Sequence, residues 1–287
     1  MINRKKILLG IAEAITLLLA VAFVSPLVLV FINSAKNNQE IILTPLALPD
    51  NWMNLVNNVR DIITNPNVGY VQAIFSSLTV TVLSLSLLVV ASAMAAWVLV
   101  RTKNKISNII FMMFVGAMVI PFQVVMFPLV KWLSLVQNFL HIPLLRSYTG
   151  IVVAYLGFGS SLAVFLFHGF IKGIPLEIEE AAAIDGCSKP RIFFSIILPI
   201  LKPIVVTVIV LNGIWIWNDY LLPMLVLGKG SPVQTLPLAV SNFAGAFLKR
   251  WDLMMTAILM ALLPVVVFFI SAQKHIIKGM VEGAIKS

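Results

Sequence analysis

Six long apolar runs constrain this chain more than any other feature. They lie at residues 7–32, 74–100, 109–130, 150–171, 205–227 and 253–272. About 20 apolar residues in a helix span the hydrocarbon core of a bilayer. The chain is 60% hydrophobic and 11% charged, whereas soluble domains are close to one half and one quarter. The sequence therefore predicts an all-α integral membrane protein with six transmembrane helices.

The distribution of Lys and Arg predicts the orientation of these helices. One set of alternate segments holds 13 basic residues in 62 positions: 1–6, 101–108, 172–204 and 273–287. The other set holds 7 in 85: 33–73, 131–149 and 228–252. Segments rich in Lys and Arg stay in the cytoplasm. We therefore expect cytoplasmic termini, an external loop at 33–73, a cytoplasmic segment at 172–204, and a single membrane domain over 1–287.

The cytoplasmic segment 172–204 begins with the pattern of a short helix. Pro175 suits a first helical position, and Glu177, Glu179 and Glu180 follow where the helix dipole favours acids. Gly186 can take the left-handed conformation that closes a helix. The pattern predicts a helix of about three turns that ends at a glycine corner.

A second short helix is predicted after this corner. Ser188 is a good N-cap, Pro190 marks a helix start, and Pro199 and Pro203 separate the helix from the next span. Its apolar residues would rest on the membrane bundle: Phe193, Phe194, Ile196 and Ile197. Two packed helices can transmit a conformational signal, which a flexible loop cannot do.

The same segment carries a motif at fixed spacing. Glu180-Ala181-Ala182 is followed by Gly186 and then by Ile196-x-Leu198-Pro199. This run matches the EAA signature, E-A-A-x-x-x-G-x9-I-x-L-P, at every fixed position. The chain thus resembles the permease subunits of bacterial ABC importers, which lie in the inner membrane.

The remainder of the chain resembles the carbohydrate branch of this family, the maltose-transporter-type permeases. The resemblance rests on Trp217 to Pro223, Thr235-Leu236-Pro237, Trp251 and the tail from Lys278 to Lys286. It covers essentially the whole chain and is strongest from about residue 73 onward. Cys187 departs from the family, which often has alanine at this position.

The resemblance implies an assembly and a role for the signature. The partners would be a second homologous permease, two cytoplasmic ATPase subunits and an external solute-binding protein, with a carbohydrate as substrate, membrane lipid around the spans and no nucleic acid. ATP and Mg would lie on the ATPase subunits, so this chain would be non-catalytic and hold no cofactor. The residues that would couple to the ATPase are Glu180, Ala181, Ala182, Asp185 and Gly186.

Polar residues near the outer end of the fifth span have two interpretations. Asn212, Asn218 and Asp219 could line a sugar pathway, because polar side chains in a span usually face a partner or a water-filled cavity. Alternatively, the neighbouring aromatic residues form an interfacial belt. Both interpretations stay open for Asn218 and Asp219.

Other functions lack the residues that they need. The three histidines are scattered and there is a single cysteine, so no metal site is predicted. Gly228-Lys229-Gly230-Ser231 does not match a phosphate-binding loop, because Pro223 stands where a glycine is required and Gly230 follows the lysine. A permease for a non-sugar solute and a self-sufficient secondary transporter stay as alternatives, and inverted repeats, which are typical of the latter, are not evident.

Overall fold

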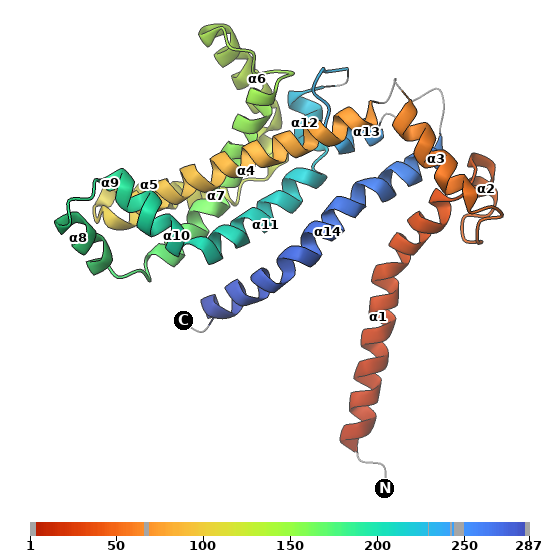
Figure 1. Ribbon diagram of the computed structural model, residues 1–287, viewed down its shortest axis with the longest axis horizontal. Coiled ribbons are helices and arrows are strands. Elements are labelled where there is room, and N and C mark those ends of the chain that lie inside the picture. Colours follow the sequence, from red (N-terminus) through yellow and green to blue (C-terminus); the bar gives the residue numbers. More distant parts are fainter. Residues whose placement is uncertain (1–3, 66–68, 229, 242, 244–249, 285–287) are drawn as a thin grey trace. The chain divides into compact units, whose positions relative to one another are not determined.

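The computed structural model describes residues 4–65, 69–228, 230–241, 243 and 250–284, and all regular elements in this part are helical (Figure 1). They are α1 Arg4–Ser34, α2 Asn38–Leu43, α3 Met53–Thr64, α4 Tyr70–Arg101, α5 Lys105–Ala117, α6 Phe122–Leu140, α7 Tyr148–Ile171, α8 Glu177–Ile184, α9 Lys189–Ile192, a π-helical turn Phe193–Ile197, α10 Leu198–Ile200, α11 Lys202–Asn218, α12 Leu221–Val226, α13 Leu236–Ser241 and α14 Trp251–Ala284. The all-α prediction is confirmed for these residues.

The number of membrane spans is close to the prediction. Five helices of the described chain are long and apolar enough to cross a bilayer: α1, α4, α6, α7 and the first part of α14. A sixth is obtained when Lys189–Ile200 and Lys202–Asn218, which meet at a bend of 76°, count as one span. The structure therefore supports five or six spans, and the predicted six is approximate. Their orientation stays a prediction.

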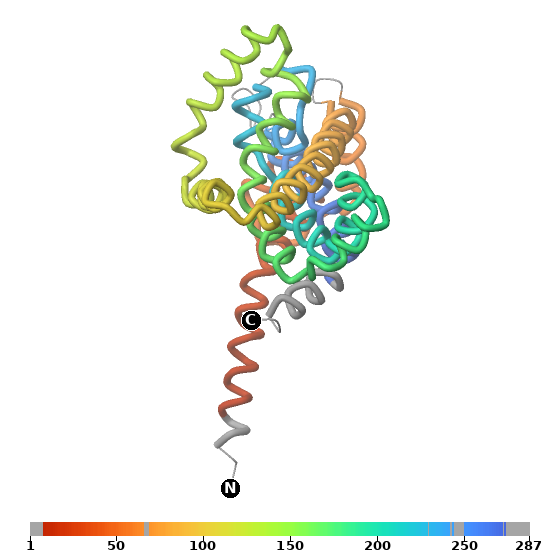
Figure 2. The backbone as a smooth tube through the Cα atoms, turned by 90° about the vertical axis from the view of Figure 1, so that its left-hand side faces the viewer, coloured from red at the N-terminus to blue at the C-terminus, as the bar shows by residue number. Residues whose placement is uncertain are grey.

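The predicted span at 109–130 is wrong as a single helix. α5 ends at Ala117, and α6 begins only at Phe122, after Pro121 in an extended conformation. Proline has no N–H to continue a helix and disfavours helical geometry in the residue before it, so the chain breaks here. Figure 2 shows α5 and α6 running in different directions. α6 then continues to Leu140, beyond the predicted end at Val130.

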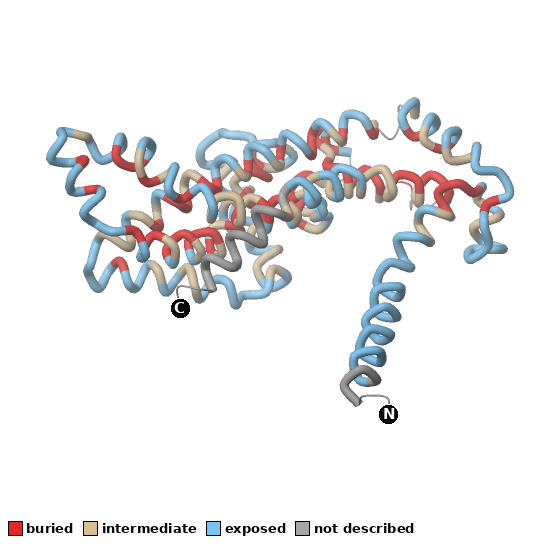
Figure 3. Tube along the Cα trace, turned by 60° about the horizontal axis from the view of Figure 1, so that its bottom comes forward, coloured by how far each residue is buried: buried red, intermediate tan, exposed pale blue. Residues whose placement is uncertain are grey.

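The chain divides into two compact units, and the first comprises residues 1–70 and 239–263. Its longest element, α1, contains Pro26 without a break. None of the apolar window in Leu8–Ser34 is buried within this unit, and α1 is pale blue over most of its length in Figure 3. An apolar helix with no covering side chains suits a surrounding of lipid or of partner subunits.

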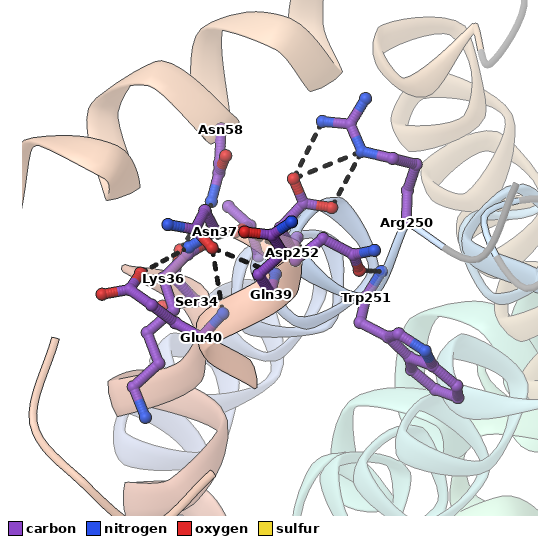
Figure 4. A network of polar contacts seen from close by, with 11 residues as sticks. Ser34, Lys36, Asn37, Gln39, Glu40, Asn58, Arg250, Trp251 and Asp252 are labelled. Atoms are coloured by element: carbon purple, nitrogen blue, oxygen red, sulfur yellow. Dashed lines mark hydrogen bonds and ion pairs between the residues drawn. The ribbon is translucent and has the colours of Figure 1, made fainter. Parts of the chain in front are cut away.

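A polar network holds the loop after α1 to the rest of this unit (Figure 4). The amide of Asn58 in α3 donates to the backbone carbonyls of Ser34, at 3.0 Å, and Lys36, at 3.2 Å. The hydroxyl of Thr256 in α14 also donates to the Ser34 carbonyl, at 2.9 Å. These bonds satisfy carbonyl groups at the end of α1 that have no partner within the helix.

The short helix α2 is fixed by its own cap and by α14. The side chain of Asn37 accepts the backbone N–H groups of Gln39 and Glu40, and the Glu40 carboxylate accepts the N–H of Asn37. This backbone hydrogen bond lowers the pKa of Glu40. The side chain of Asn38 accepts the N–H of Trp251 at 3.0 Å. The loop between α1 and α3 is thus held mainly by bonds to backbone groups.

The second unit comprises residues 71–238 and 264–287 and contains the predicted coupling segment. Its largest buried cluster joins α4, α7 and α11 with the residues between α7 and α11. A second cluster joins α4, α6, α7, α11 and α12. The segment after α7 therefore belongs to a packed core. The single domain over 1–287 stays a prediction.

Candidate functional site

The first helix of the candidate site is α8. The backbone N–H groups of Glu179 and Glu180 both donate to the carbonyl of Leu176, so the helix begins at Glu177. The prediction that Pro175 opens the helix is wrong by two residues, and α8 has 8 residues, which is shorter than about three turns. The three acids lie in the first turn as predicted.

The glycine corner after α8 is confirmed. Gly186 has φ +81°, which residues with a Cβ rarely adopt. The N–H of Cys187 donates to the Ala182 carbonyl, and the N–H of Gly186 donates to the Ala183 carbonyl, both at 3.0 Å. These bonds close the end of α8 in the way that a left-handed glycine permits. Figure 1 shows the chain reversing between α8 and α9.

The second helix follows the corner as predicted, with one difference. Ser188 occupies the N-cap position of α9 as predicted, but its side chain makes no capping bond. The helix continues through a π-helical turn at Phe193–Ile197, just before Pro199 interrupts the backbone bonding. It ends at Leu201, where the chain bends by 76° into α11. The separation from the fifth span is confirmed.

The second helix packs on the bundle through one side. Ile192, Phe193 and Ile197 are buried in a cluster with residues of α4 and α7. Phe194, which was expected on the same side, is 48% exposed. The helix therefore has a fixed position on the core, as a part that transmits movement requires.

The signature residues divide between surface and core. Glu180, Ala181, Asp185 and Gly186 are exposed. Ala182 is buried at 7% exposure and packs in the same cluster as Phe193. The exposed face of α8 is thus acidic and carries small side chains, so that a partner protein can approach it closely. The ATPase-coupling role of these five residues stays a prediction.

Glu179 is a site residue that sequence reasoning missed. It is buried at 8% exposure, next to the exposed Glu180. Its carboxylate accepts the indole N–H of Trp97 at 3.0 Å and pairs with the guanidinium of Arg101 at 2.7 Å. The only sequence signal was a basic residue at the end of α4 and three acids in one turn, which does not say which acid turns inward.

The proposed pathway residues lie in different surroundings. Asn212 is buried at 3% exposure, and its amide donates to the Val208 carbonyl one turn earlier. A Cβ added to Gly159 of α7 would lie 3.0 Å from the Asn212 amide oxygen, so α7 and α11 approach closely there. Asn212 thus lies in the packing between two helices. Its part in a substrate pathway stays a prediction.

Asn218 and Asp219 lie where α11 ends, inside the predicted fifth span at 205–227. The Asp219 carboxylate accepts the Tyr155 hydroxyl at 3.1 Å and the N–H of Leu221 at 3.0 Å. Asp219 therefore lies in the break between α11 and α12. The predicted fifth span at 205–227 is wrong as a single continuous helix. Asn218 is exposed, and its amide donates to the Ile214 carbonyl. The structure brings the two residues together at one turn, apart from Asn212.

Metal chemistry finds no support in the described part of the chain. Groups of three or more His, Cys, Asp or Glu that could hold a metal ion do not occur there. His168 is instead stacked on Phe111, with ring centroids 3.6 Å apart. Lys229, from the rejected phosphate-loop pattern, lies outside the described residues.

Comparisons with known proteins agree with this geometry. Residues 88–282 match the profile of the family described as "Binding-protein-dependent transport system inner membrane component". The chain is 43% identical to a probable starch degradation products transport system permease of Thermoanaerobacterium thermosulfurigenes, over 94% of both chains. It is 34% identical to a melibiose/raffinose/stachyose import permease of Bacillus subtilis, over 75% of this chain and 76% of the relative.

A solved structure shows the same fold. It is a chain of a bacterial ABC transporter involved in the import of the acidic polysaccharide alginate, with a TM-score of 0.75 and 19% identity. The likeness covers 96% of this chain and 98% of the other. The fold of the importer permeases is therefore present over nearly the whole length.

Proposed function

Because this chain belongs to the family of binding-protein-dependent transport system inner membrane components, we propose that it forms half of the translocation pathway of an ATP-driven carbohydrate importer. The observation that carries the proposal is α8: an exposed acidic helix with the complete signature, mounted on a packed core. Such an element couples a cytoplasmic ATPase to the membrane bundle. The chain itself is non-catalytic, and ATP with Mg binds to the ATPase subunits.

The proposed assembly follows from the apolar and acidic surfaces that this chain leaves exposed. The apolar side chains of α1 are exposed along the helix, which suits lipid and a second, homologous permease. Two ATPase subunits bind on the cytoplasmic side through Glu180, Ala181, Ala182, Asp185 and Gly186. An external solute-binding protein delivers the substrate. Both termini of this chain are cytoplasmic in this arrangement.

The switch is a two-state equilibrium. ATP favours the state in which the ATPase subunits are closed, and their movement displaces α8 and the helix after Gly186. The bundle then changes from inward-open to outward-open, and hydrolysis resets it. A ligand shifts such an equilibrium only by its difference in affinity for the two states, so α8 must bind the ATPase in a defined position.

The substrate proposal rests on the relatives. Their names give starch degradation products and melibiose, raffinose or stachyose as transported solutes. We propose an oligosaccharide for this chain as well, with Asn212, Asn218 and Asp219 as the candidate pathway residues.

The test is a purification followed by a transport assay. Tagged chain is expressed with its neighbouring reading frames, purified, and reconstituted with the binding protein and radiolabelled maltotriose or raffinose. We expect an ATPase and a second permease to co-purify, and sugar uptake to require ATP. Full transport by the purified single chain would refute the proposal, and uptake of only a non-sugar solute would correct the substrate class.

Glu180→Lys tests the role of the signature. Reversing a first-turn charge costs a helix only about 0.3–1 kcal/mol, so membrane abundance should be unchanged while ATPase association and uptake are lost. Glu177→Lys is the matched control, because Glu177 is also exposed in the first turn of α8 but lies outside the signature. Equal effects of the two changes would show that the signature acid has no special role.

A further inference from the structure

One end of α4 contacts both halves of the segment between α7 and α11. The carboxylate of Glu179 on α8 accepts the indole N–H of Trp97 at 3.0 Å and the Nε–H of Arg101 at 2.8 Å. Trp97 and Arg101 are four residues apart and so lie on one face of the last turn of α4. α8 is therefore attached to a helix that is not its neighbour in sequence.

The same two side chains make further contacts on either side of α8. Arg101 donates from Nη2 to the backbone carbonyl of Ile174, at 3.1 Å, in the turn before α8. The ring of Trp97 lies against Phe193, in the helix after the glycine corner, with centroids 5.5 Å apart. Three points of the coupling segment are thus held by the end of α4.

Along the chain, α8 is connected to its neighbours by a turn on either side. On one side, residues 172–176 form a turn from α7, and on the other, Gly186 has φ +81° with nothing within 4 Å of the position that a Cβ would occupy. The carboxylate of Glu179 is buried, at 9% side-chain exposure, and the Arg101 cation that it binds is partly buried, at 20%. Separating the two charges would leave the buried Glu179 carboxylate without a charged partner, which opposes opening of this contact.

We propose that Trp97, Arg101 and Glu179 are positioning residues that keep α8 attached to α4 throughout the transport cycle, so that a displacement of α8 by the ATPase moves α4 directly. This inference rests on the proposed function. It adds a third connection to the two that the sequence shows, α7 before the segment and α11 after it. Glu180 faces the ATPase, while Glu179 fixes the helix that carries it.

The first experiment asks whether the contact stays closed. Arg101→Cys and Glu179→Cys are combined in a Cys187→Ser parent, because Cys187 is the only cysteine in the sequence of this chain. The purified importer complex is assayed for sugar transported per ATP hydrolysed, before and after treatment with a short bifunctional thiol reagent. We expect the ratio to be low before treatment and to return to that of the parent after cross-linking. Cross-linked complex that stays uncoupled or stops cycling would overturn the proposal, because the contact would then have to open.

The second experiment removes single bonds and uses smaller changes. Glu179→Gln removes the charge at nearly constant size, and Trp97→Phe removes the N–H donor but retains a ring against Phe193. We expect normal abundance and normal ATPase association in both, with sugar per ATP reduced about fivefold, the lower end of typical coupling effects. Lys103→Ala is the matched control, because it removes an exposed cation two residues after Arg101. A merely stabilising role would lower abundance and leave the ratio unchanged.

The outcomes separate this inference from the proposed function. If the parent complex lacks an ATPase or ATP-dependent uptake, the proposed function fails. If the parent is coupled and both Glu179→Gln and Trp97→Phe keep its ratio of sugar to ATP, only the role of α4 is refuted.

Discussion

Two pairs of adjacent polar residues, one on α8 and one at the end of α11, show the same division of roles. In each pair one side chain turns inward and the other stays exposed. Glu179 binds Arg101 and Trp97 while Glu180 is exposed. Asp219 binds Tyr155 and caps α12, while Asn218 is exposed. The inward member fixes the local structure, and the exposed member is available to a partner or a substrate.

The two pairs differ in how the inward acid is held. Glu179 has a full cation as its partner, on a helix distant in sequence. Asp219 has a neutral hydroxyl and backbone N–H groups as partners, and one of these belongs to the residue two positions later. Glu179 and Arg101 thus join two helices by opposite charges, whereas the Asp219 carboxylate meets α7 through one neutral hydroxyl and also accepts the N–H that starts α12. We therefore expect changes near Glu179 to affect coupling, and changes at Asp219 to affect stability in addition to its proposed part in the substrate pathway.

The largest effect is expected at the corner next to the first pair. Gly186→Val places a branched side chain at φ +81°, which costs about 1–3 kcal/mol of strain and would shift α8. Uptake should fall about tenfold or more, with the spans still folded. Gly228→Ala is the control, because Gly228 also has a positive φ, +73°, but lies outside the coupling segment. Comparable losses of uptake in both variants would remove the distinction between coupling and general strain.

Asp219→Ala should have the next largest effect, and on stability. It removes the cap of α12 and leaves the Tyr155 hydroxyl without its acceptor, for a loss of about 2 kcal/mol. The midpoint of thermal unfolding of the purified complex measures this loss. Asp219→Asn retains an acceptor oxygen and should lose about half as much. If Asp219→Ala instead lowered sugar per ATP at unchanged stability, the inward acid of the second pair would be a coupling residue too.

The sequence predicted the elements better than the contacts between them. Apolar runs located most spans, and a fixed signature with glycine and proline positions located the two short helices and the corner. Pro121 could mark either a kink within one helix or the boundary between two helices, and the length of the apolar run does not distinguish the two. The inward turn of Glu179 depends on where the last turn of α4 lies, and this follows from packing over a long sequence separation.

The exposed member of the second pair is where the two interpretations of the outer end of α11 can be separated. Within the described residues, the Asn218 amide bonds to the Ile214 carbonyl of its own helix, so Asn218→Ala should leave stability within a few tenths of a kcal/mol. If Asn218 contacts sugar, the apparent affinity for uptake should fall about fivefold, the value of one hydrogen bond. Unchanged rate and affinity in uptake assays would favour the aromatic belt instead.

Tyr155→Phe should have a small effect, on stability alone, and it tests the bond that holds the inward acid of the second pair. It removes the hydroxyl that donates to Asp219 at 3.1 Å but retains the ring, which meets Trp215 edge-on with centroids 5.4 Å apart. A hydrogen bond to a charged group contributes about 1.5 kcal/mol at the lower end of its range, and Asp219 still accepts the N–H of Leu221 at the start of α12. We therefore expect a small decrease in the unfolding midpoint and no change in uptake. The double variant Tyr155→Phe with Asp219→Ala should lose less stability than the sum of the losses of the two single variants, because both changes remove the same bond. Additive losses would show that Tyr155 and Asp219 act independently, and a loss of uptake in Tyr155→Phe alone would place the bond in the transport pathway.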